Sequence, residues 1–120
     1  MKSKLFLTIA GAYFLLDGLA GFFMVSGFDF IAYAYGIFCM SLGALFLMTR
    51  NEAASTARNA IFMTGFLASF FVSLTAYYAQ WSGLFLDSPA GYIPPTLWLL
   101  VAIGFFLIGR ANMSPKEKMK

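Results

Sequence analysis

The sequence predicts an all-α integral membrane protein: a four-helix bundle with up-down-up-down topology and both termini in the cytoplasm. Three observations predict it. Of the 120 residues, 61% are hydrophobic and only 11% are charged, whereas soluble domains are roughly 45–50% apolar and about 25% charged. The apolar residues form four runs that, at about 1.5 Å per helical residue, cross most or all of a roughly 30 Å hydrocarbon layer. The basic residues lie at the ends of these runs.

The four apolar runs define the predicted helices within one transmembrane domain that covers residues 1–120. The helices are expected at about 5–25, 30–49, 57–81 and 95–109. The first run is longer than the roughly 7–15 residue core of a cleaved signal peptide. We therefore expect the first run to be retained as a membrane helix.

Local signals mark the boundaries between these helices. Gly27 lies in a short polar segment and predicts a tight turn between the first two helices. Either Ser55 or Thr56 is a suitable N-cap for the third helix. Pro94 and Pro95 suit the first turn of the fourth helix, because the N–H groups that proline lacks have no partner in a first turn.

The basic residues predict the orientation of the chain. They are Lys2, Lys4, Arg50, Arg58, Arg110, Lys116, Lys118 and Lys120. All eight lie at the N-terminus, between the second and third helices, or at the C-terminus, whereas Asp29 and Asp87 lie in the other two loops. By the positive-inside rule, both termini are therefore predicted to be cytoplasmic.

The composition excludes several kinds of chemistry. The chain has no histidine and one cysteine, Cys39. It therefore lacks His ligands for haem or zinc, a Ser-His-Asp or Cys-His catalytic group, and a second thiol for an intramolecular disulfide. We expect no metal site, no cofactor and a non-enzymatic protein, since acid–base catalysis would depend on Asp17 and tyrosines alone. The basic residues form no patch, so no nucleic-acid partner is expected.

Asp17 is the one charged residue deep inside a predicted membrane span, near the middle of the first helix. Such charges are costly and often functional. No lysine or arginine lies at the same depth, and loss of water favours the neutral form of a carboxyl group. Two interpretations stay open: an exchangeable proton site, and a neutral acid that is hydrogen-bonded within the protein. Residues at similar depth complete the candidate ligand or proton site: Tyr13, Cys39, Ser41, Ser69 and Ser73.

Small residues recur at spacings of three, four or seven, which places them along helix faces. The candidates for close helix packing are Gly11, Gly18, Gly21, Gly36, Gly43 and Gly65. Such faces let helix backbones approach in a membrane, within one chain or between the chains of a homo-oligomer. The fifteen phenylalanines and six tyrosines are typical of lipid-facing positions, and they also allow a cavity for a hydrophobic ligand.

The chain resembles small four-helix bacterial inner-membrane proteins of the DoxX-like group. Gly36, Gly43 and Arg50 in the second helix and the inward-facing Arg110 carry the resemblance, which covers most of the chain. It implies a multi-pass protein of the cell inner membrane with redox-associated or accessory roles, and it brings no active-site residues. The length and the acid in the first helix are also similar to small multidrug resistance transporters. Those proteins carry a glutamate, and later Trp and Tyr motifs that are absent here.

The sequence thus favours an accessory subunit or a hydrophobic-ligand-binding bundle. The alternative is a proton-coupled carrier of small hydrophobic or cationic solutes, with Asp17 as its exchangeable group. The expected partners are the lipid bilayer and either further copies of the chain or a larger membrane complex.

Overall fold

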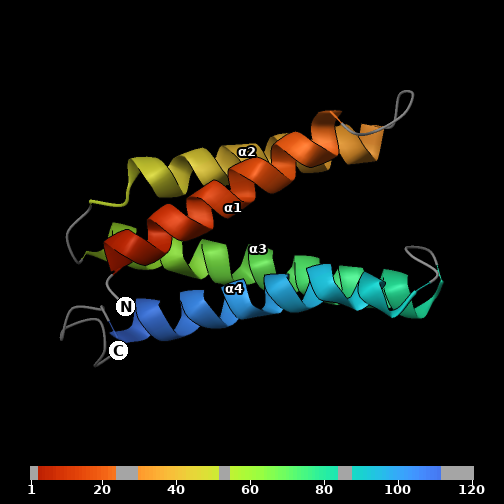
Figure 1. Ribbon diagram of the computed structural model, residues 1–120. Helices are drawn as coiled ribbons and strands as arrows, with labels where there is room; N and C mark the ends of the chain where they lie inside the picture. Colours follow the sequence, from red (N-terminus) through yellow and green to blue (C-terminus); the bar gives the residue numbers. More distant parts are fainter. Residues whose placement is uncertain (1–2, 24–29, 52–54, 84–87, 112–120) are drawn as a thin grey trace. The chain divides into compact units, whose positions relative to one another are not determined.

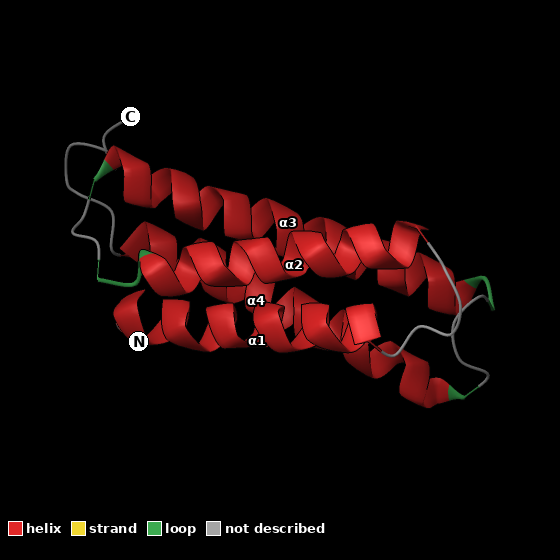
Figure 2. Cartoon of the chain, turned by 90° about the horizontal axis from the view of Figure 1, so that it is seen from above, coloured by secondary structure: helices red, strands yellow, loops and turns green. Residues whose placement is uncertain are grey.

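A computed structural model describes residues 3–23, 30–51, 55–83 and 88–111. Within these ranges the chain is helical apart from short turns, as Figures 1 and 2 show. The elements are α1 (Ser3–Phe23), α2 (Phe30–Met48), α3 (Thr56–Trp81), the 3-10 turn η1 (Pro89–Tyr92) and α4 (Ile93–Ala111). Apart from the end of α1, which borders residues outside the description, their ends differ from the expected ranges by at most two residues, which is the usual uncertainty of a helix end.

Some of the predicted features lie outside the described residues. They are the end of the first helix at 24–25, the turn at Gly27, the acids Asp29 and Asp87, and the terminal lysines Lys2, Lys116, Lys118 and Lys120. Gly21 lies in α1, but its surroundings are also outside the description.

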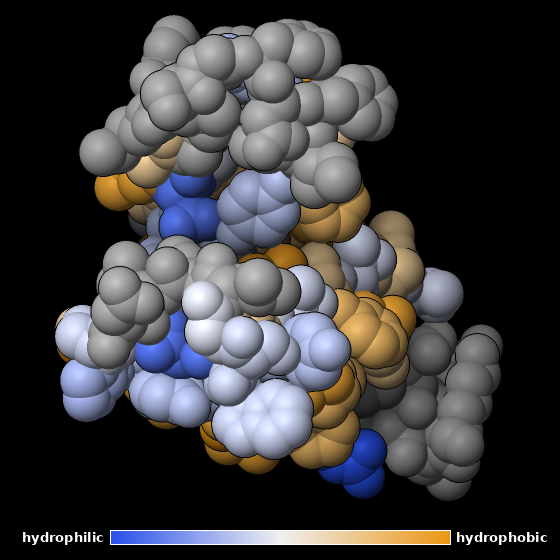
Figure 3. Space-filling model, turned by 90° about the vertical axis from the view of Figure 1, so that its right-hand side faces the viewer, coloured by the Kyte–Doolittle hydropathy of each residue, from blue (hydrophilic) through white to orange (hydrophobic). Residues whose placement is uncertain are grey.

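Three helical segments are long and apolar enough to cross a membrane. They are Ser3–Ala20, Thr56–Trp81 and Pro89–Ala111, and α2 adds the shorter apolar stretch Tyr33–Met48. Large apolar side chains also lie on the outside of these helices: Leu16 is 67% exposed and Phe71 is 60% exposed. Figure 3 shows hydrophobic side chains, coloured orange, at the surface of the molecule. Apolar helices with apolar exposed faces are the expected form of a membrane protein.

The chain divides into two compact units, one made of α1 and α2 and the other of α3, η1 and α4. In the first unit, the backbones of the two helices approach closely at glycines. A Cβ atom on Gly43 would lie 2.7 Å from the Gly11 carbonyl oxygen, and one on Gly18 would lie 2.7 Å from the Gly36 carbonyl oxygen. Four of the predicted small residues, Gly11, Gly18, Gly36 and Gly43, therefore lie at the α1–α2 contact, where no larger side chain has room.

Aromatic side chains pack in each unit. Phe14 of α1 and Phe46 of α2 meet edge to face, with ring centroids 5.1 Å apart, and both are fully buried. In the second unit, Phe105 of α4 lies directly on Gly65 of α3, so that a Cβ on this glycine would overlap the ring. Edge-to-face contacts are a favoured geometry for aromatic pairs.

The third helix begins as the sequence predicts. Ser55 is its N-cap, and the Ser55 hydroxyl accepts a hydrogen bond from the Arg58 backbone N–H at 3.1 Å. This bond satisfies one of the N–H groups that have no partner inside the helix. The prediction that Ser55 or Thr56 caps α3 is therefore confirmed, with Ser55 as the cap.

The segment before α4 contains η1, where the sequence predicted only a loop. Pro89 begins this 3-10 turn, at a position where its missing N–H costs nothing. The buried Gln80 side chain of α3 donates a hydrogen bond to the Ser88 carbonyl oxygen at 3.0 Å and packs against Gly91, which leaves no space for a Cβ there. Because η1 runs directly into α4, this helix begins at Ile93 rather than at the second proline.

Candidate functional site

Asp17 is hydrogen-bonded to a tyrosine of the neighbouring helix. The Tyr35 hydroxyl of α2 donates to the Asp17 Oδ2 atom of α1 at 2.8 Å, and both side chains are half-buried. The close approach of the two backbones at Gly18 and Gly36, each next in sequence to one of these residues, brings the side chains together. The acid therefore has a polar partner within its own unit, and this partner is neutral.

Two of the predicted site residues lie beside this pair. Tyr13 is one helical turn before Asp17, and Cys39 is one turn after Tyr35. Both lie close enough to Asp17 for an electrostatic interaction with its side chain. Tyr13, Asp17, Tyr35 and Cys39 form the group that we call the Asp17 cluster.

The three predicted serines have other surroundings. Ser41 lies on an exposed face of α2 and donates to the Ile37 carbonyl oxygen of its own helix at 2.8 Å. Ser73 of α3 is buried and donates to the Pro95 carbonyl oxygen of α4 at 2.9 Å, so it joins the two helices of the second unit. Ser69 is also buried in α3, and its hydroxyl has no hydrogen-bond partner among the described residues.

Sequence reasoning did not name Tyr35 as the partner of Asp17. It treated Tyr35 only as one of the six tyrosines that are typical of lipid-facing positions. A signal was available, because Asp17 and Tyr35 lie at similar distances from the turn between α1 and α2. In an antiparallel hairpin, residues equally far from the turn lie at the same depth.

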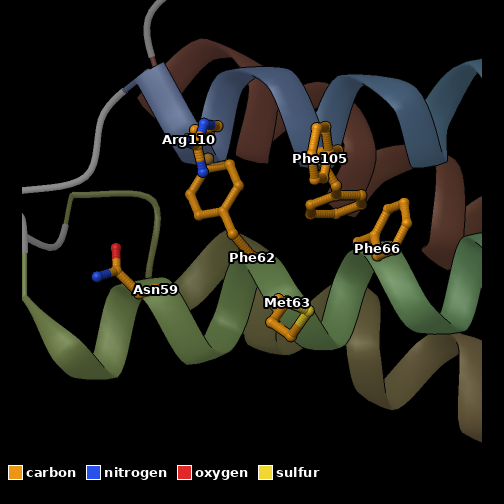
Figure 4. A pocket seen from close by; sticks show the side chains of 8 residues that line it. Asn59, Phe62, Met63, Phe66, Phe105 and Arg110 are labelled. Atoms are coloured by element: carbon orange, nitrogen blue, oxygen red, sulfur yellow. The ribbon is translucent and has the colours of Figure 1, made fainter. Parts of the chain in front are cut away.

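A second feature is a cavity of about 190 Å³ between α3 and α4 (Figure 4). Its lining residues are Asn59, Phe62, Met63 and Phe66 from α3, and Phe105, Phe106, Gly109 and Arg110 from α4. We call this space the α3–α4 cavity. Sequence reasoning allowed for a hydrophobic cavity but assigned none of these residues to it, although the i, i+4 spacing of Phe62 and Phe66 was visible.

The walls of the α3–α4 cavity are aromatic. The rings of Phe62 and Phe105 meet at 5.8 Å between centroids, and those of Phe66 and Phe106 at 5.6 Å. Phe62 and Phe105 are buried, while Phe106 and Met63 are 50% and 55% exposed. The cavity is therefore closed along its buried rings and open beside Met63 and Phe106.

The polar groups of the cavity lie together at one end. Asn59 is in the first turn of α3 and Arg110 in the last turn of α4, and the antiparallel helices bring these two turns together. The Asn59 Nδ2 atom is buried and has no hydrogen-bond partner in the part of the chain that the structure describes. Arg110 is exposed. This arrangement gives the cavity one polar end and an apolar body.

The chain matches no protein-family model, and comparisons with curated proteins and with solved structures also gave no match. The resemblance to DoxX-like proteins therefore stays a prediction that rests on Gly36, Gly43, Arg50 and Arg110.

Proposed function

We propose that this is a non-enzymatic, multi-pass protein of the bacterial inner membrane that binds a hydrophobic ligand in the α3–α4 cavity. The observation that carries the proposal is the aromatic lining of this cavity. Sites for hydrophobic ligands are concave and mostly apolar, with a few polar groups that orient the ligand. The protein works by itself, as a homo-oligomer, or as an accessory subunit of a larger membrane complex.

The proposed topology is up-down-up-down with both termini in the cytoplasm. Arg50 follows α2, Arg58 lies in the first turn of α3 and Arg110 lies in the last turn of α4. Antiparallel passage through the membrane puts all three arginines on one side, which the positive-inside rule assigns to the cytoplasm. The α3–α4 cavity, which includes Arg110, then lies at the cytoplasmic end of its unit.

The cavity is small for a closed binding site. Its volume of about 190 Å³ is below the roughly 300–1,000 Å³ of typical ligand pockets. A ligand can nevertheless bind with only part of its length in the cavity. The side next to Met63 and Phe106 is open, so the rest of the ligand extends into the bilayer. The fit therefore favours part of an acyl chain or a similar elongated apolar group over a compact soluble molecule.

Filling the cavity tests the proposed function. Labelling of the full chain in nanodiscs by a photoreactive fatty-acyl probe is expected to concentrate on the cavity residues of α3 and α4. Met63→Trp places an indole beside the cavity and is expected to weaken this labelling about tenfold, the factor that corresponds to roughly 1.4 kcal/mol of lost binding. Mass spectrometry of the labelled peptides measures the effect.

The matched control for this experiment is Leu67→Trp. Leu67 lies one turn further along α3, is 44% exposed and does not line the cavity. Leu67→Trp is expected to leave the labelling pattern unchanged. Even labelling of all four helices in the wild-type protein, or equal labelling in both Trp variants, contradicts the proposed function.

A proton-coupled carrier that uses Asp17 is the second candidate function, and the Asp17 cluster favours it. The cluster places an acid, two phenols and a thiol close together inside two helices that are proposed to span the membrane. Ionisable groups at such depth often form proton pathways. The competing explanation is structural, because the hydrogen bond from Tyr35 already gives the acid a partner.

Replacing Asp17 by asparagine separates these two roles. The amide oxygen of the new side chain can still accept the Tyr35 hydrogen bond, so we expect Asp17→Asn to change the free energy of unfolding by less than about 1 kcal/mol. An amide neither takes up nor releases a net proton near neutral pH, so a carrier is expected to lose solute uptake driven by a pH gradient in proteoliposomes. Tyr35→Phe is the control that keeps the carboxyl group and removes the hydrogen bond. Unchanged uptake by the Asp17→Asn protein excludes the carrier function.

A further inference from the structure

We propose that the α3–α4 cavity selects an anionic phospholipid. Arg110 and Asn59 bind the phosphate at the polar end, and the phenylalanines hold a segment of one acyl chain. This inference rests on the proposed function, since it names the class of hydrophobic ligand that the same cavity takes. It adds a headgroup specificity that the aromatic lining alone does not require.

The order of residues along the cavity matches an amphiphile. Arg110 and Asn59 lie at the end where α3 begins and α4 ends, and Figure 4 shows Phe62 beside this end and Phe66 and Phe105 further from it. A ligand that follows the cavity therefore meets polar groups first and aromatic rings afterwards. A phospholipid has this order from its phosphate to its acyl chains.

The two polar groups are suited to an anion. A guanidinium group offers a planar pair of donors that matches the oxygens of a phosphate, and the resulting bonds are strengthened by charge. The buried Asn59 Nδ2 atom is a donor with no partner among the described residues, which is costly unless something accepts its hydrogen bond. A phosphate bound by Arg110 satisfies this donor when the Asn59 amide, which points away from Arg110 in Figure 4, rotates towards the cavity mouth.

The depth of the polar end is that of a lipid headgroup. Asn59 and Arg110 lie in terminal turns of the two helices, and the ends of membrane-spanning helices lie at the boundary between hydrocarbon and headgroups. Basic pockets between helices on the cytoplasmic side of a membrane bind anionic headgroups. The open side at Met63 and Phe106 lets a chain enter from the bilayer without passing through water.

Titration of the full chain in detergent with phosphatidylglycerol and with phosphatidylcholine of identical acyl chains tests the proposal. Native mass spectrometry measures the dissociation constants. The wild-type protein is expected to bind phosphatidylglycerol about tenfold more tightly than phosphatidylcholine. Arg110→Gln is expected to remove this preference, because it weakens phosphatidylglycerol binding about tenfold and weakens phosphatidylcholine less, since the phosphate of phosphatidylcholine is already balanced by its own choline cation. Asn59→Leu is expected to reduce the preference partly.

The matched control is Arg50→Gln. Arg50 is also exposed, follows α2, and lies outside the cavity. Its replacement is expected to keep the full preference for phosphatidylglycerol. An equal loss in the Arg50→Gln and Arg110→Gln proteins overturns the proposal, because the preference then reflects net positive charge rather than a site.

Further outcomes distinguish a failure of the headgroup specificity from a failure of the proposed function. They also distinguish binding of a lipid from binding of free phosphate. Equal affinity for the two lipids, with both weakened by Met63→Trp, overturns the anionic specificity but leaves the proposed function in place. Binding of both lipids that Met63→Trp does not weaken overturns the proposed function as well. Displacement of phosphatidylglycerol by millimolar inorganic phosphate overturns the assignment to a lipid, because the site then recognises phosphate alone.

Discussion

Replacing Gly43 by leucine is expected to separate α1 from α2 and to lower the free energy of unfolding by roughly 3 kcal/mol, the upper part of the usual range for overpacking. A Cβ on Gly43 would lie 2.7 Å from the Gly11 carbonyl oxygen and 2.8 Å from the Leu15 backbone nitrogen. Both neighbours are backbone atoms, so no change of rotamer relieves the contact. The helices have to move apart, and the packing around the glycines is lost.

Unfolding by sodium dodecyl sulfate in mixed micelles, followed by circular dichroism, measures this effect. Ala12→Leu is the control, because it adds a larger side chain at an exposed position of α1 next to Gly11. It is expected to change the unfolding free energy by less than about 0.5 kcal/mol. If the Gly43→Leu protein unfolds at the same detergent fraction as the Ala12→Leu protein, the close α1–α2 contact is wrong.

Separation of the helices would also break the Asp17 cluster, since Tyr35 reaches Asp17 from α2. The Gly43→Leu protein is therefore expected to lose any function that depends on this hydrogen bond, although the three atoms nearest to a Cβ on Gly43 belong to Gly11 and Leu15 rather than to the cluster. A comparison of Gly43→Leu with Tyr35→Phe distinguishes loss of the helix contact from loss of the bond alone.

The features that the sequence predicted well depend on local chemistry. The four helices follow from the lengths of the apolar runs, and the start of α3 follows from the ability of Ser55 to cap a helix. Both signals lie within a few residues of the feature that they predict. The turn η1 was missed because Gln80 stabilises it from the preceding helix, through the Ser88 carbonyl oxygen.

The features that the sequence could not predict depend on the rotation of each helix about its axis. In a soluble helix, polar residues mark the outer face, but helices in lipid are apolar on every side and lack this mark. The faces that carry Tyr35 and Phe105 could therefore not be deduced from periodicity. Gly65 was identified as a packing residue, but the sequence did not reveal that the Phe105 ring fills the space above it.

Phe105→Ala is expected to destabilise the second unit by about 2 kcal/mol, and Phe106→Ala by much less. Phe105 is 1% exposed and lies on Gly65, whereas Phe106 is 50% exposed. Truncation of the buried ring leaves roughly 100 Å³ empty, which at about 24 cal/mol per Å³ of cavity gives this value. In soluble proteins such a truncation also loses the free energy of transferring the ring out of water. This second contribution is small for a helix that is surrounded by lipid. The half-exposed Phe106 ring contacts the protein on one side only, so Phe106→Ala removes fewer contacts.

The same detergent titration compares the two alanine variants, and a third substitution tests the cause. Gly65→Leu is expected to be destabilising in the wild-type protein, because its side chain would overlap the Phe105 ring. Combined with Phe105→Ala, the new leucine fills the vacated space, so the double variant is expected to be more stable than the sum of the two single changes predicts, by about 1 kcal/mol or more. Additive effects would show that the ring and the glycine are not in contact. In that case the Phe105 ring would not pack on α3, and the wall of the α3–α4 cavity that this ring forms would be wrong.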